Sequence, residues 1–200
     1  MMNDPAPPEP AASSDPLRGL AAARQARGPA PVHLWNPPYC GEIDMRIARD
    51  GTWFYNGTPI GRPALVQLFA GVLRKDPERF VLVTPVERVG IAVEDAPFLG
   101  VELLREGEGE AQTLRLRTNV DDWVDISEKN PLKFLPGDSG GLKPYALVRG
   151  ELWALVKRAL FYDLVAWGES RTVKGEEMFG VFSNGAFFAM APMREIADFT

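Results

Sequence analysis

The stretch RDGTWFYNGTPIGR, residues 49–62, holds residue types that could bind an anion. Three aromatic residues, Trp53 to Tyr55, lie between the turn signals Asp50-Gly51 and Asn56-Gly57, and Arg62 follows just ahead of a helical pattern. A helix N-terminus carries partial positive charge, an arginine fork matches phosphate oxygens, and aromatic rings stack on bases. The alternative is that the rings belong to the core and that Arg62 is solvated.

Two further segments extend this candidate site. Arg149 precedes a second helical pattern in a position that matches Arg62, and Arg49 and Arg158 are additional candidates for contacts with an anion. Arg158 falls in mid-helix, where a solvated face is the commoner explanation. We expect six residues to meet at the junction of two halves of the chain and to bind a small anionic molecule there: Trp53, Tyr55, Arg62, Thr84, Glu87 and Arg149. On this hypothesis, Arg62→Ala and Arg149→Ala each weaken the ligand and leave the fold intact.

Residue types for catalysis and for metal binding are few. Cys40 and the single histidine, His33, are seven residues apart. They could form a nucleophile–base dyad, but a small unreactive thiol and a surface histidine are the simpler interpretation. One His and one Cys are too few for a usual transition-metal site. The carboxylates of Asp44, Glu94 and Asp95 could hold Mg²⁺, or Glu94 and Asp95 simply form a turn. We therefore assign no catalytic residue, no metal and no cofactor.

Composition limits the class of partner. The 200 residues include 22 basic and 27 acidic side chains, so the formal net charge is −5. This balance argues against duplex nucleic acid, because cationic contacts to phosphates supply most of that affinity. The sequence has no run of 18 apolar residues, and its first residues lack the features of a signal peptide. Its one cysteine, Cys40, cannot form an internal disulfide, and we expect a cytoplasmic protein.

Turn signals and hydrophobic periodicity divide the chain into four segments. Residues 1–31 are rich in Pro and Ala and predict a disordered arm. Residues 32–126 hold several alternating runs around an apolar helical stripe over 62–76, which predicts an α+β domain. Residues 127–144 are dense in Pro, Gly and Ser and are typical of a linker. Residues 145–200 predict a second α+β domain, with a helix over 151–167 and a hairpin that turns at Asn184-Gly185.

The two domains show a weak internal repeat. Residues 53–93 and 145–190 each run strand, arginine, apolar helix, strand and strand. We predict an α+β fold with two similar strand-helix-strand-strand units, a domain duplication, in which mostly antiparallel sheets each pack one helix. The alternative is chance similarity between short stretches. A second unit of about 50 residues is too small to cover its many aromatic side chains, so we expect it to dock on the first. Ligand sites are common at such junctions.

Three segments carry a resemblance to a known family: PVHLWNPPYCGEIDMRIARDGTWFYNGTPIGRPALVQLF, FVLVTPVERVGIAVEDAPF, and the region from VRGELWALVKRALFYDLV to GVFSNGAFF. In this order they resemble the uncharacterised bacterial family called domain of unknown function (DUF) 1285, over most of residues 32–190. The resemblance implies a duplicated α+β unit whose second half is similar to pleckstrin-homology folds. It also implies a nucleotide-like ligand between the halves and a role in signalling, but no established activity.

Three functions follow as alternatives. The first is non-catalytic binding of a small anionic, nucleotide-like ligand at the interface of two domains, with a role in signalling. The second is a protein-interaction module that uses the N-terminal arm and the acidic surface to reach a partner not identified by the sequence. The third is an enzyme that acts on a phosphorylated small molecule, and the single His and single Cys weigh against it.

Overall fold

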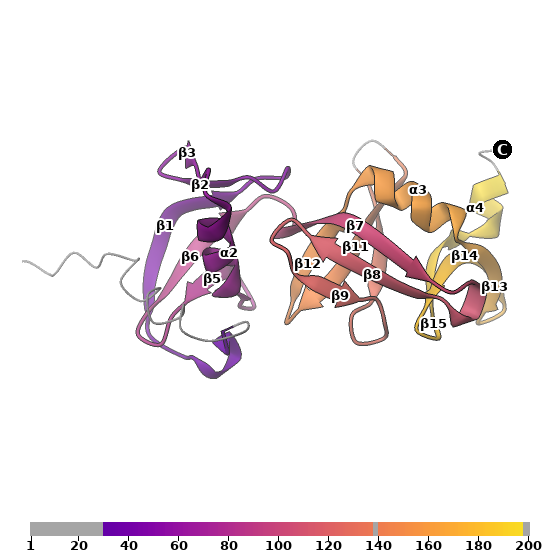
Figure 1. Ribbon diagram of the computed structural model, residues 1–200, viewed down its shortest axis with the longest axis horizontal. Coiled ribbons are helices and arrows are strands. Elements are labelled where there is room, and N and C mark those ends of the chain that lie inside the picture. The colour runs from indigo at the N-terminus through magenta and orange to yellow at the C-terminus, as the bar shows by residue number, and fades with distance from the viewer. Residues whose placement is uncertain (1–29, 138–139, 198–200) are drawn as a thin grey trace, which may run out of the picture.

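The computed structural model describes residues 30–137 and 140–197 and consists mainly of strands with few helices. The fold is therefore richer in β-structure than the expected α+β class. The expected arm, residues 1–31, falls almost wholly outside the described residues. Three sheets follow one another along the long axis of the molecule (Figure 1). No helix in the described part of the chain has both the length and the apolar character to cross a membrane.

The first sheet is formed by residues 39–93. A short 3-10 helix, η1 (Val32–Leu34), precedes it, and the helix α2 (Pro63–Gly71) lies between its third and fourth strands. The strands are β1 (Tyr39–Ile47), β2 (Trp53–Tyr55), β3 (Thr58–Pro59), β4 (Leu73–Lys75), β5 (Phe80–Val83) and β6 (Arg88–Val93). Their spatial order is β3-β2-β1-β6-β5-β4, with β1 and β6 parallel and the other neighbours antiparallel. Two three-stranded meanders are thus joined along their first and last strands.

The second sheet, residues 98–156, repeats this topology. Its strands are β7 (Phe98–Glu106), β8 (Thr113–Thr118), β9 (Trp123–Asp125), β10 (Leu132–Pro136), β11 (Leu142–Arg149) and β12 (Leu152–Val156). Their order is β10-β11-β12-β7-β8-β9, and β7 and β12 are the parallel pair. When β7 is counted as the first strand and the order is read from β9 to β10, the second sheet has the same strand order as the first sheet. The duplicated units are therefore residues 39–93 and 98–156, rather than the 53–93 and 145–190 expected from the sequence.

A third sheet closes the far end of the second one. The chain continues through α3 (Arg158–Ala166), the antiparallel strands β13 (Glu169–Val173), β14 (Glu176–Ser183) and β15 (Ala186–Pro192), and α4 (Met193–Ala197). Buried polar groups join β14 to the second sheet. The Ser183 hydroxyl donates to the Ile126 carbonyl at 2.7 Å and accepts from the Leu114 N–H at 2.9 Å. Gln112, beside the 3-10 helix η2 (Gly109–Ala111), donates to the Phe182 carbonyl at 2.8 Å.

Three of the expected elements differ in the structure. The helix expected over 62–76 ends at Gly71, and Leu73 begins a strand that pairs with β5. The first part of the helix expected over 151–167 is strand β12, with buried and half-buried residues in alternation and with β7 and β11 as neighbours. The linker expected over 127–144 contains β10, which pairs with β11. In each case pairing with another strand decides the conformation, and the periodicity of the segment itself does not reveal that partner.

Consequently, the second sheet crosses the domain boundaries expected from the sequence. Strands β7 to β9 fall in the segment expected as the first domain, β10 in the expected linker, and β11 and β12 in the expected second domain. The chain instead passes between the two six-stranded units at residues 94–97, just after β6.

The tight turns agree with the sequence at two of three positions. Asn56-Gly57 and Asn184-Gly185 have positive φ at both residues, as a type I′ hairpin requires. At Asp50-Gly51 only Gly51 has a positive φ, 81°, and the Asp50 carboxylate accepts the Thr52 N–H at 2.9 Å. This hairpin is therefore a wider turn that the aspartate closes with its side chain.

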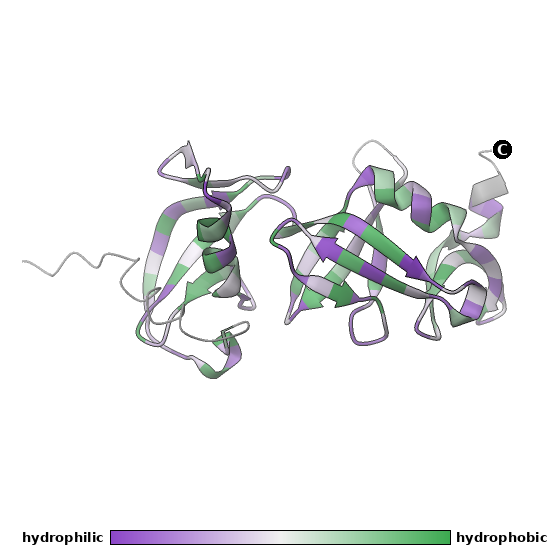
Figure 2. Ribbon diagram, in the orientation of Figure 1, coloured by the Kyte–Doolittle hydropathy of each residue, from purple (hydrophilic) through white to green (hydrophobic). Residues whose placement is uncertain are grey.

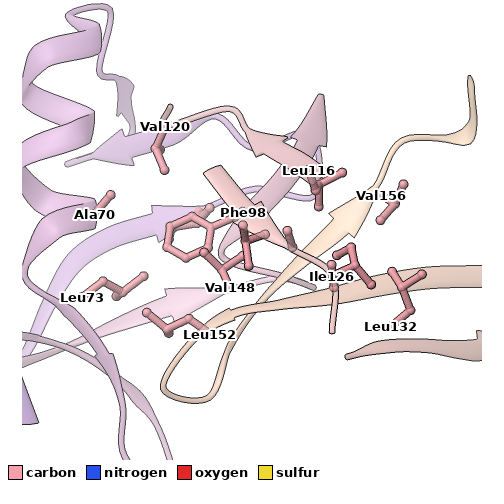
Figure 3. Packing of buried hydrophobic residues seen from close by; sticks show 14 of the residues in the cluster. Ala70, Leu73, Phe98, Leu116, Val120, Ile126, Leu132, Val148, Leu152 and Val156 are labelled. Atoms are coloured by element: carbon pink, nitrogen blue, oxygen red, sulfur yellow. The ribbon is translucent and has the colours of Figure 1, made fainter. Parts of the chain in front are cut away.

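One buried apolar cluster runs through the junction between the two six-stranded units. Ala70 and Leu73 of the first unit belong to the same cluster as Phe98, Val148 and Leu152 of the second (Figure 3). Along β8, hydrophobic and hydrophilic residues alternate, as expected for a strand with one covered face (Figure 2). The units therefore share a core, and their relative position is fixed by apolar packing as well as by polar contacts.

Candidate functional site

Arg149 lies at the junction of the two units, at the end of β11. Its Nη2 donates to the carbonyl of Ala70, in the last turn of α2, at 2.7 Å, and its Nη1 pairs with Asp122. The guanidinium carbon lies 5.0 Å from the centre of the Phe98 ring. A helix C-terminus carries partial negative charge, so this arginine stabilises the end of α2 and joins the two units.

We expect Arg149→Ala to lower the free energy of unfolding by about 2 kcal/mol, because two charge-assisted hydrogen bonds, to the Ala70 carbonyl and to Asp122, are lost. Urea denaturation measures the change. Arg115→Ala is the matched control, since Arg115 pairs with Asp125 and both side chains are more than half exposed. That variant should change stability by about 0.5 kcal/mol or less. Equal effects of the two substitutions would contradict the role given to Arg149.

Arg62 occupies the opposite end of the same helix. It is the N-cap residue of α2, is exposed, and lines none of the pockets described below. The structure therefore does not bring Arg62 and Arg149 together at one ligand. The sequence suggested equivalence because both arginines seemed to precede a helix, but Arg149 precedes a turn that leads into strand β12.

Three of the expected site residues meet in a pocket between α2 and the first sheet, here called the α2 pocket. Tyr55 comes from β2, and Thr84 and Glu87 come from the turn between β5 and β6. Trp53 is fully buried and stacks on Phe69, with ring centres 6.2 Å apart. The pocket has a volume of about 90 Å³ and is lined by Ile43, Met45, Tyr55, Ile60, Leu65, Phe69, Leu82, Thr84, Glu87 and Val89. Its lining contains a carboxylate and no cation, so it does not suit an anion.

A larger cleft, here called the junction cleft, lies where the β1–β2 turn faces the second unit. Its volume is about 650 Å³. Four cationic side chains line it, accompanied by one carboxylate and two aromatic rings. The lining residues are Arg49, Asp50, Leu99, Gly137, Gly140, Gly141, Leu142, Lys143, Pro144, Leu155, Val156, Lys157, Arg158, Phe161 and Tyr162. The cleft combines positive charge with aromatic surface. Arg49 and Arg158, two further candidates for contacts with an anion, line it, whereas none of the six residues expected to form the site does.

Close packing holds the β1–β2 turn against the second unit. Gly51 has a positive φ, and a Cβ atom there would lie 2.8 Å from the amide nitrogen of Asn119 and 2.9 Å from a methyl carbon of Leu99. A larger residue would have to push these side-chain ends aside and would be strained by the positive φ. The conformation of Gly51 lets Arg49 and Asp50 reach the cleft.

The opposite wall of the cleft is the beginning of α3. Lys157 is the N-cap residue of α3, and its N–H donates to the Gly100 carbonyl at 3.2 Å, which fixes the helix start on β7. The Arg158 guanidinium donates to the Tyr162 hydroxyl one turn later, at 3.0 Å. Within residues 30–137 and 140–197, no carboxylate pairs with Lys157 or Arg158. Their charges add to the partial positive charge of the helix start.

A charged cluster borders the cleft at Asp95. The Tyr145 hydroxyl donates to the Asp95 carboxylate at 2.7 Å, and the Lys143 ammonium pairs with it. Burial alone would raise the pKa of Asp95, but these hydrogen bonds, with the charges of Lys143 and Arg49, hold that pKa below its ordinary value. The same hydrogen bond to Asp95 has the opposite effect on Lys143 and raises the pKa of its ammonium group above the ordinary value. Both groups are therefore charged at neutral pH, and Asp95 balances part of the positive charge here.

With this geometry in place, comparison with known proteins identifies the family. The DUF1285 N-terminal domain model matches residues 30–96, and the DUF1285 C-terminal domain model matches residues 97–190. The chain belongs to the DUF1285 family. A DUF1285 family protein from Silicibacter pomeroyi DSS-3, known from a crystal structure, shares 48% sequence identity with this chain. The match covers 90% of this chain and 97% of the Silicibacter protein, and the TM-score between the two structures is 0.81. A second DUF1285 family protein of known crystal structure, from Shewanella baltica OS155, shares 28% identity. The match covers 60% of this chain and 87% of the Shewanella protein, with a TM-score of 0.49. No curated protein matches the chain.

The two DUF1285 models meet between residues 96 and 97, where the chain passes from the first six-stranded unit to the second. The junction cleft therefore combines residues of both family domains. Arg49 and Asp50 come from the N-terminal domain, and Lys143, Lys157 and Arg158 come from the C-terminal domain.

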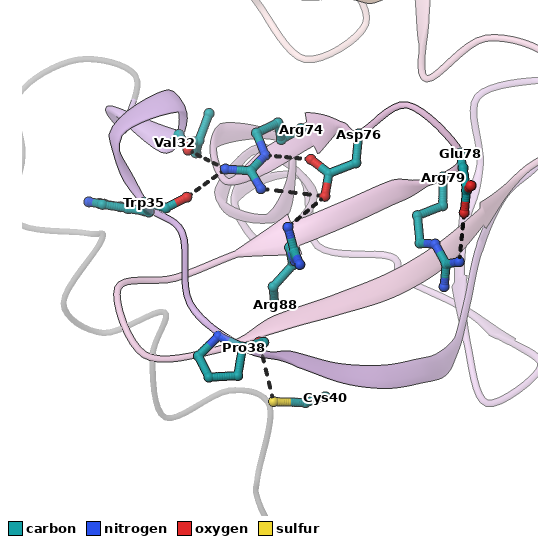
Figure 4. A network of polar contacts seen from close by, with 9 residues as sticks. All are labelled: Val32, Trp35, Pro38, Cys40, Arg74, Asp76, Glu78, Arg79 and Arg88. Atoms are coloured by element: carbon teal, nitrogen blue, oxygen red, sulfur yellow. Dashed lines mark hydrogen bonds and ion pairs between the residues drawn. The ribbon is translucent and has the colours of Figure 1, made fainter.

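The catalytic dyad considered for this DUF1285 chain is absent from the structure. The Cys40 thiol is exposed and contacts the Pro38 carbonyl at 3.6 Å, and no hydrogen bond joins it to His33 in the described part of the chain. The segment before β1 is held instead by Arg74, whose Nη1 donates to the carbonyls of Val32 and Trp35 at 2.8 and 2.6 Å (Figure 4). The polar contacts of this segment thus hold it in position and prepare no nucleophile.

Two of the three candidate Mg²⁺ ligands, Glu94 and Asp95, are engaged elsewhere. Glu94 pairs with Arg46 and accepts the backbone N–H of Arg49 at 3.1 Å, and Asp95 pairs with Lys143. Among the residues that the structure describes, no three His, Cys, Asp or Glu side chains are placed to hold a metal ion.

A G-x-S-x-G pattern at residues 137–141 was not among the expected features. In hydrolases this pattern places a serine on a turn from a strand to a helix. Here the strands on either side of the pattern, β10 and β11, are antiparallel neighbours, and Asp138 and Ser139 lie outside the described residues. The context therefore differs from that of a nucleophile elbow.

Proposed function

We propose that the protein binds a small organic phosphate in the junction cleft, between its two family domains, without catalysing a reaction. The observation that carries the proposal is the set of four cationic side chains that line one cleft, two of them, Lys157 and Arg158, at the start of α3. Phosphate groups combine well with arginine, lysine and helix N-termini. The volume of about 650 Å³ lies in the usual range for small-molecule sites.

Two aromatic residues support an aromatic, nucleotide-like ligand over inorganic phosphate. Phe161 and Tyr162 lie on α3 beside Arg158, and the Tyr162 side chain is exposed although it is large and mostly apolar. A planar ring can stack on such a surface. The signalling role, the cytoplasmic setting and the likeness of the C-terminal half to pleckstrin-homology folds belong to the same proposal and are not needed for the binding test.

Isothermal titration with phenyl phosphate and adenosine monophosphate, each compared with phenol and adenosine, tests the proposal. The phosphates should bind and the uncharged partners should bind more weakly. Lys157→Gln combined with Arg158→Gln should weaken the phosphates by about tenfold or more, since each charge-assisted contact contributes about 1.5–3 kcal/mol.

The matched control is Arg62→Gln, which removes an exposed arginine at the start of the other helix, α2, outside the cleft. The Arg62→Gln variant should bind phenyl phosphate and adenosine monophosphate with the same affinity as the unmodified protein. The proposal fails if no phosphate binds, or if the double variant binds as tightly as the control.

A further inference from the structure

The charges of the junction cleft are divided unevenly between its two sides. On the side formed by α3, here called the α3 wall, Lys157 and Arg158 contribute two positive charges. In the described part of the chain, neither of them pairs with a carboxylate. The side formed by the β1–β2 turn, here called the turn wall, brings Arg49 to the cleft together with a carboxylate, Asp50. A ligand therefore meets different electrostatic surroundings at the two walls.

Carboxylates offset the positive charge of the turn wall. Asp95 borders this wall, where its carboxylate pairs with the Lys143 ammonium and is also stabilised by the charge of Arg49. At the turn itself, the Asp50 carboxylate accepts the Thr52 N–H at 2.9 Å. This hydrogen bond holds the pKa of Asp50 below its ordinary value, so the group is charged at neutral pH. Two carboxylates thus balance the charges of Arg49 and Lys143, and the positive charge left over lies at the α3 wall.

The donors of the α3 wall match one phosphate group. The first N–H groups of a helix have no acceptor within the helix. Those of Leu160 and Phe161 donate to the Lys157 carbonyl at 2.9 and 3.1 Å, which leaves the N–H groups of Arg158 and Ala159 within the part of the chain that the structure describes. A phosphate monoester has three acceptor oxygens and a charge of about −1.5 to −2 at neutral pH. Two N–H groups and two cationic side chains therefore suffice for one phosphate and leave none for a second.

A second phosphate would find unfavourable surroundings in the rest of the cleft. Leu99 and Leu155, which are paired residues of the neighbouring strands β7 and β12, contribute apolar surface to the lining. A phosphate beside the turn would lose hydration and would meet the like charge of Asp50. A hydroxyl group can instead donate a hydrogen bond to that carboxylate. Asp50 therefore favours a neutral, hydroxyl-bearing group over an anion at the turn wall.

We propose that the junction cleft selects compounds with a single phosphate monoester, and that Asp50 is the residue that excludes a second phosphate. This inference rests on the proposed function and narrows its ligand class. The phosphate binds at the α3 wall, and the hydroxyl groups of a sugar ring lie toward the turn wall. Nucleoside monophosphates belong to the class, whereas nucleoside bisphosphates, which carry a second phosphate on the ribose, do not.

Isothermal titration of the full-length protein with adenosine 5′-monophosphate and with adenosine 3′,5′-bisphosphate, at equal ionic strength, tests this selection. The unmodified protein should bind the monophosphate about tenfold or more tightly than the bisphosphate, because of the like charge at the turn. Asp50→Asn keeps an oxygen that can accept the Thr52 N–H and removes the charge. In this variant the ratio of the two affinities should fall to about threefold or less.

Asp44→Asn is the matched control. Asp44 is an exposed carboxylate of the same unit, on β1 and outside the cleft. Both substitutions change the net charge of the protein by the same amount, so a general effect of charge would alter both ratios equally. The Asp44→Asn variant should keep the ratio of the unmodified protein.

The outcomes separate this inference from the proposed function. If the monophosphate binds and the bisphosphate binds as tightly or more tightly, the selection is overturned and the proposed function stands. The same holds if Asp50→Asn leaves the ratio unchanged, or shifts it no more than Asp44→Asn does. If neither compound binds, the proposed function fails and this inference fails with it.

Discussion

Residues 145–200, expressed alone, will not fold. This fragment contains β12 to β15 but only the last part of β11, and it lacks β10, the neighbour of β11, and β7, the parallel neighbour of β12. It also lacks the partners of buried Ser183, namely the Ile126 carbonyl and the Leu114 N–H. About 50 residues with open sheet edges and uncovered aromatic side chains cannot offset the entropy of folding.

Circular dichroism during heating and the dispersion of amide NMR signals measure this outcome. The fragment should show no cooperative transition and poorly dispersed signals. The matched control is a longer fragment, residues 97–200, which keeps all six strands of the second sheet together with the third sheet. It should give a cooperative transition. A cooperative transition in the shorter fragment would contradict the assignment of β7 to β12 to one structural unit.

Phe98→Ala will have the largest effect of any single substitution considered in this protein. The Phe98 side chain is fully buried, belongs to the cluster that crosses the junction, and lies under the Arg149 guanidinium (Figure 3). Truncation of a buried phenylalanine usually costs about 3–5 kcal/mol, through lost apolar burial and the cavity that remains. We expect a loss in this range.

Urea denaturation of the full-length protein measures the loss, and Leu104→Ala provides the control. Leu104 lies on the same strand, β7, with 44% of its surface exposed, so its truncation should cost less than about 1 kcal/mol. A loss below about 1.5 kcal/mol for Phe98→Ala would show that the junction collapses around the missing ring, and that the two units are not held by this contact.

The sequence by itself determined the local features of this protein. The pairs Asn56-Gly57 and Asn184-Gly185 predicted tight turns, and the apolar stripe over 62–76 predicted the helix α2, although α2 ends earlier, at Gly71. Each depends on the φ preference of one or two residues or on a short period of burial. The segments that resemble DUF1285 also identified the family correctly.

For the candidate sites, the sequence supplied the residue types but only part of the grouping. Tyr55, Thr84 and Glu87 were expected to lie together, and they do, although in an apolar pocket instead of an anion site. Arg62 and Arg149 were expected to converge and instead occupy the two ends of α2. Of the four cations in the junction cleft, Arg49 and Arg158 were named from the sequence, and Lys143 and Lys157 were not. They come from three separate regions of the chain, around residues 49, 143 and 157, so no local spacing groups them.

Only the tertiary structure decided which strands are neighbours. The segment LWALV has a pattern that suits a helix or a strand, and it is a strand because β7 and β11 supply hydrogen-bond partners on both sides. The linker-like segment before β11 contains the edge strand β10, because β11 supplies hydrogen-bond partners on one side. Strand pairing satisfies backbone donors and acceptors with residues far away in the chain, and a local pattern records only which face of a segment is buried. For that physical reason the true repeat, residues 39–93 and 98–156, becomes visible only in the order of the strands.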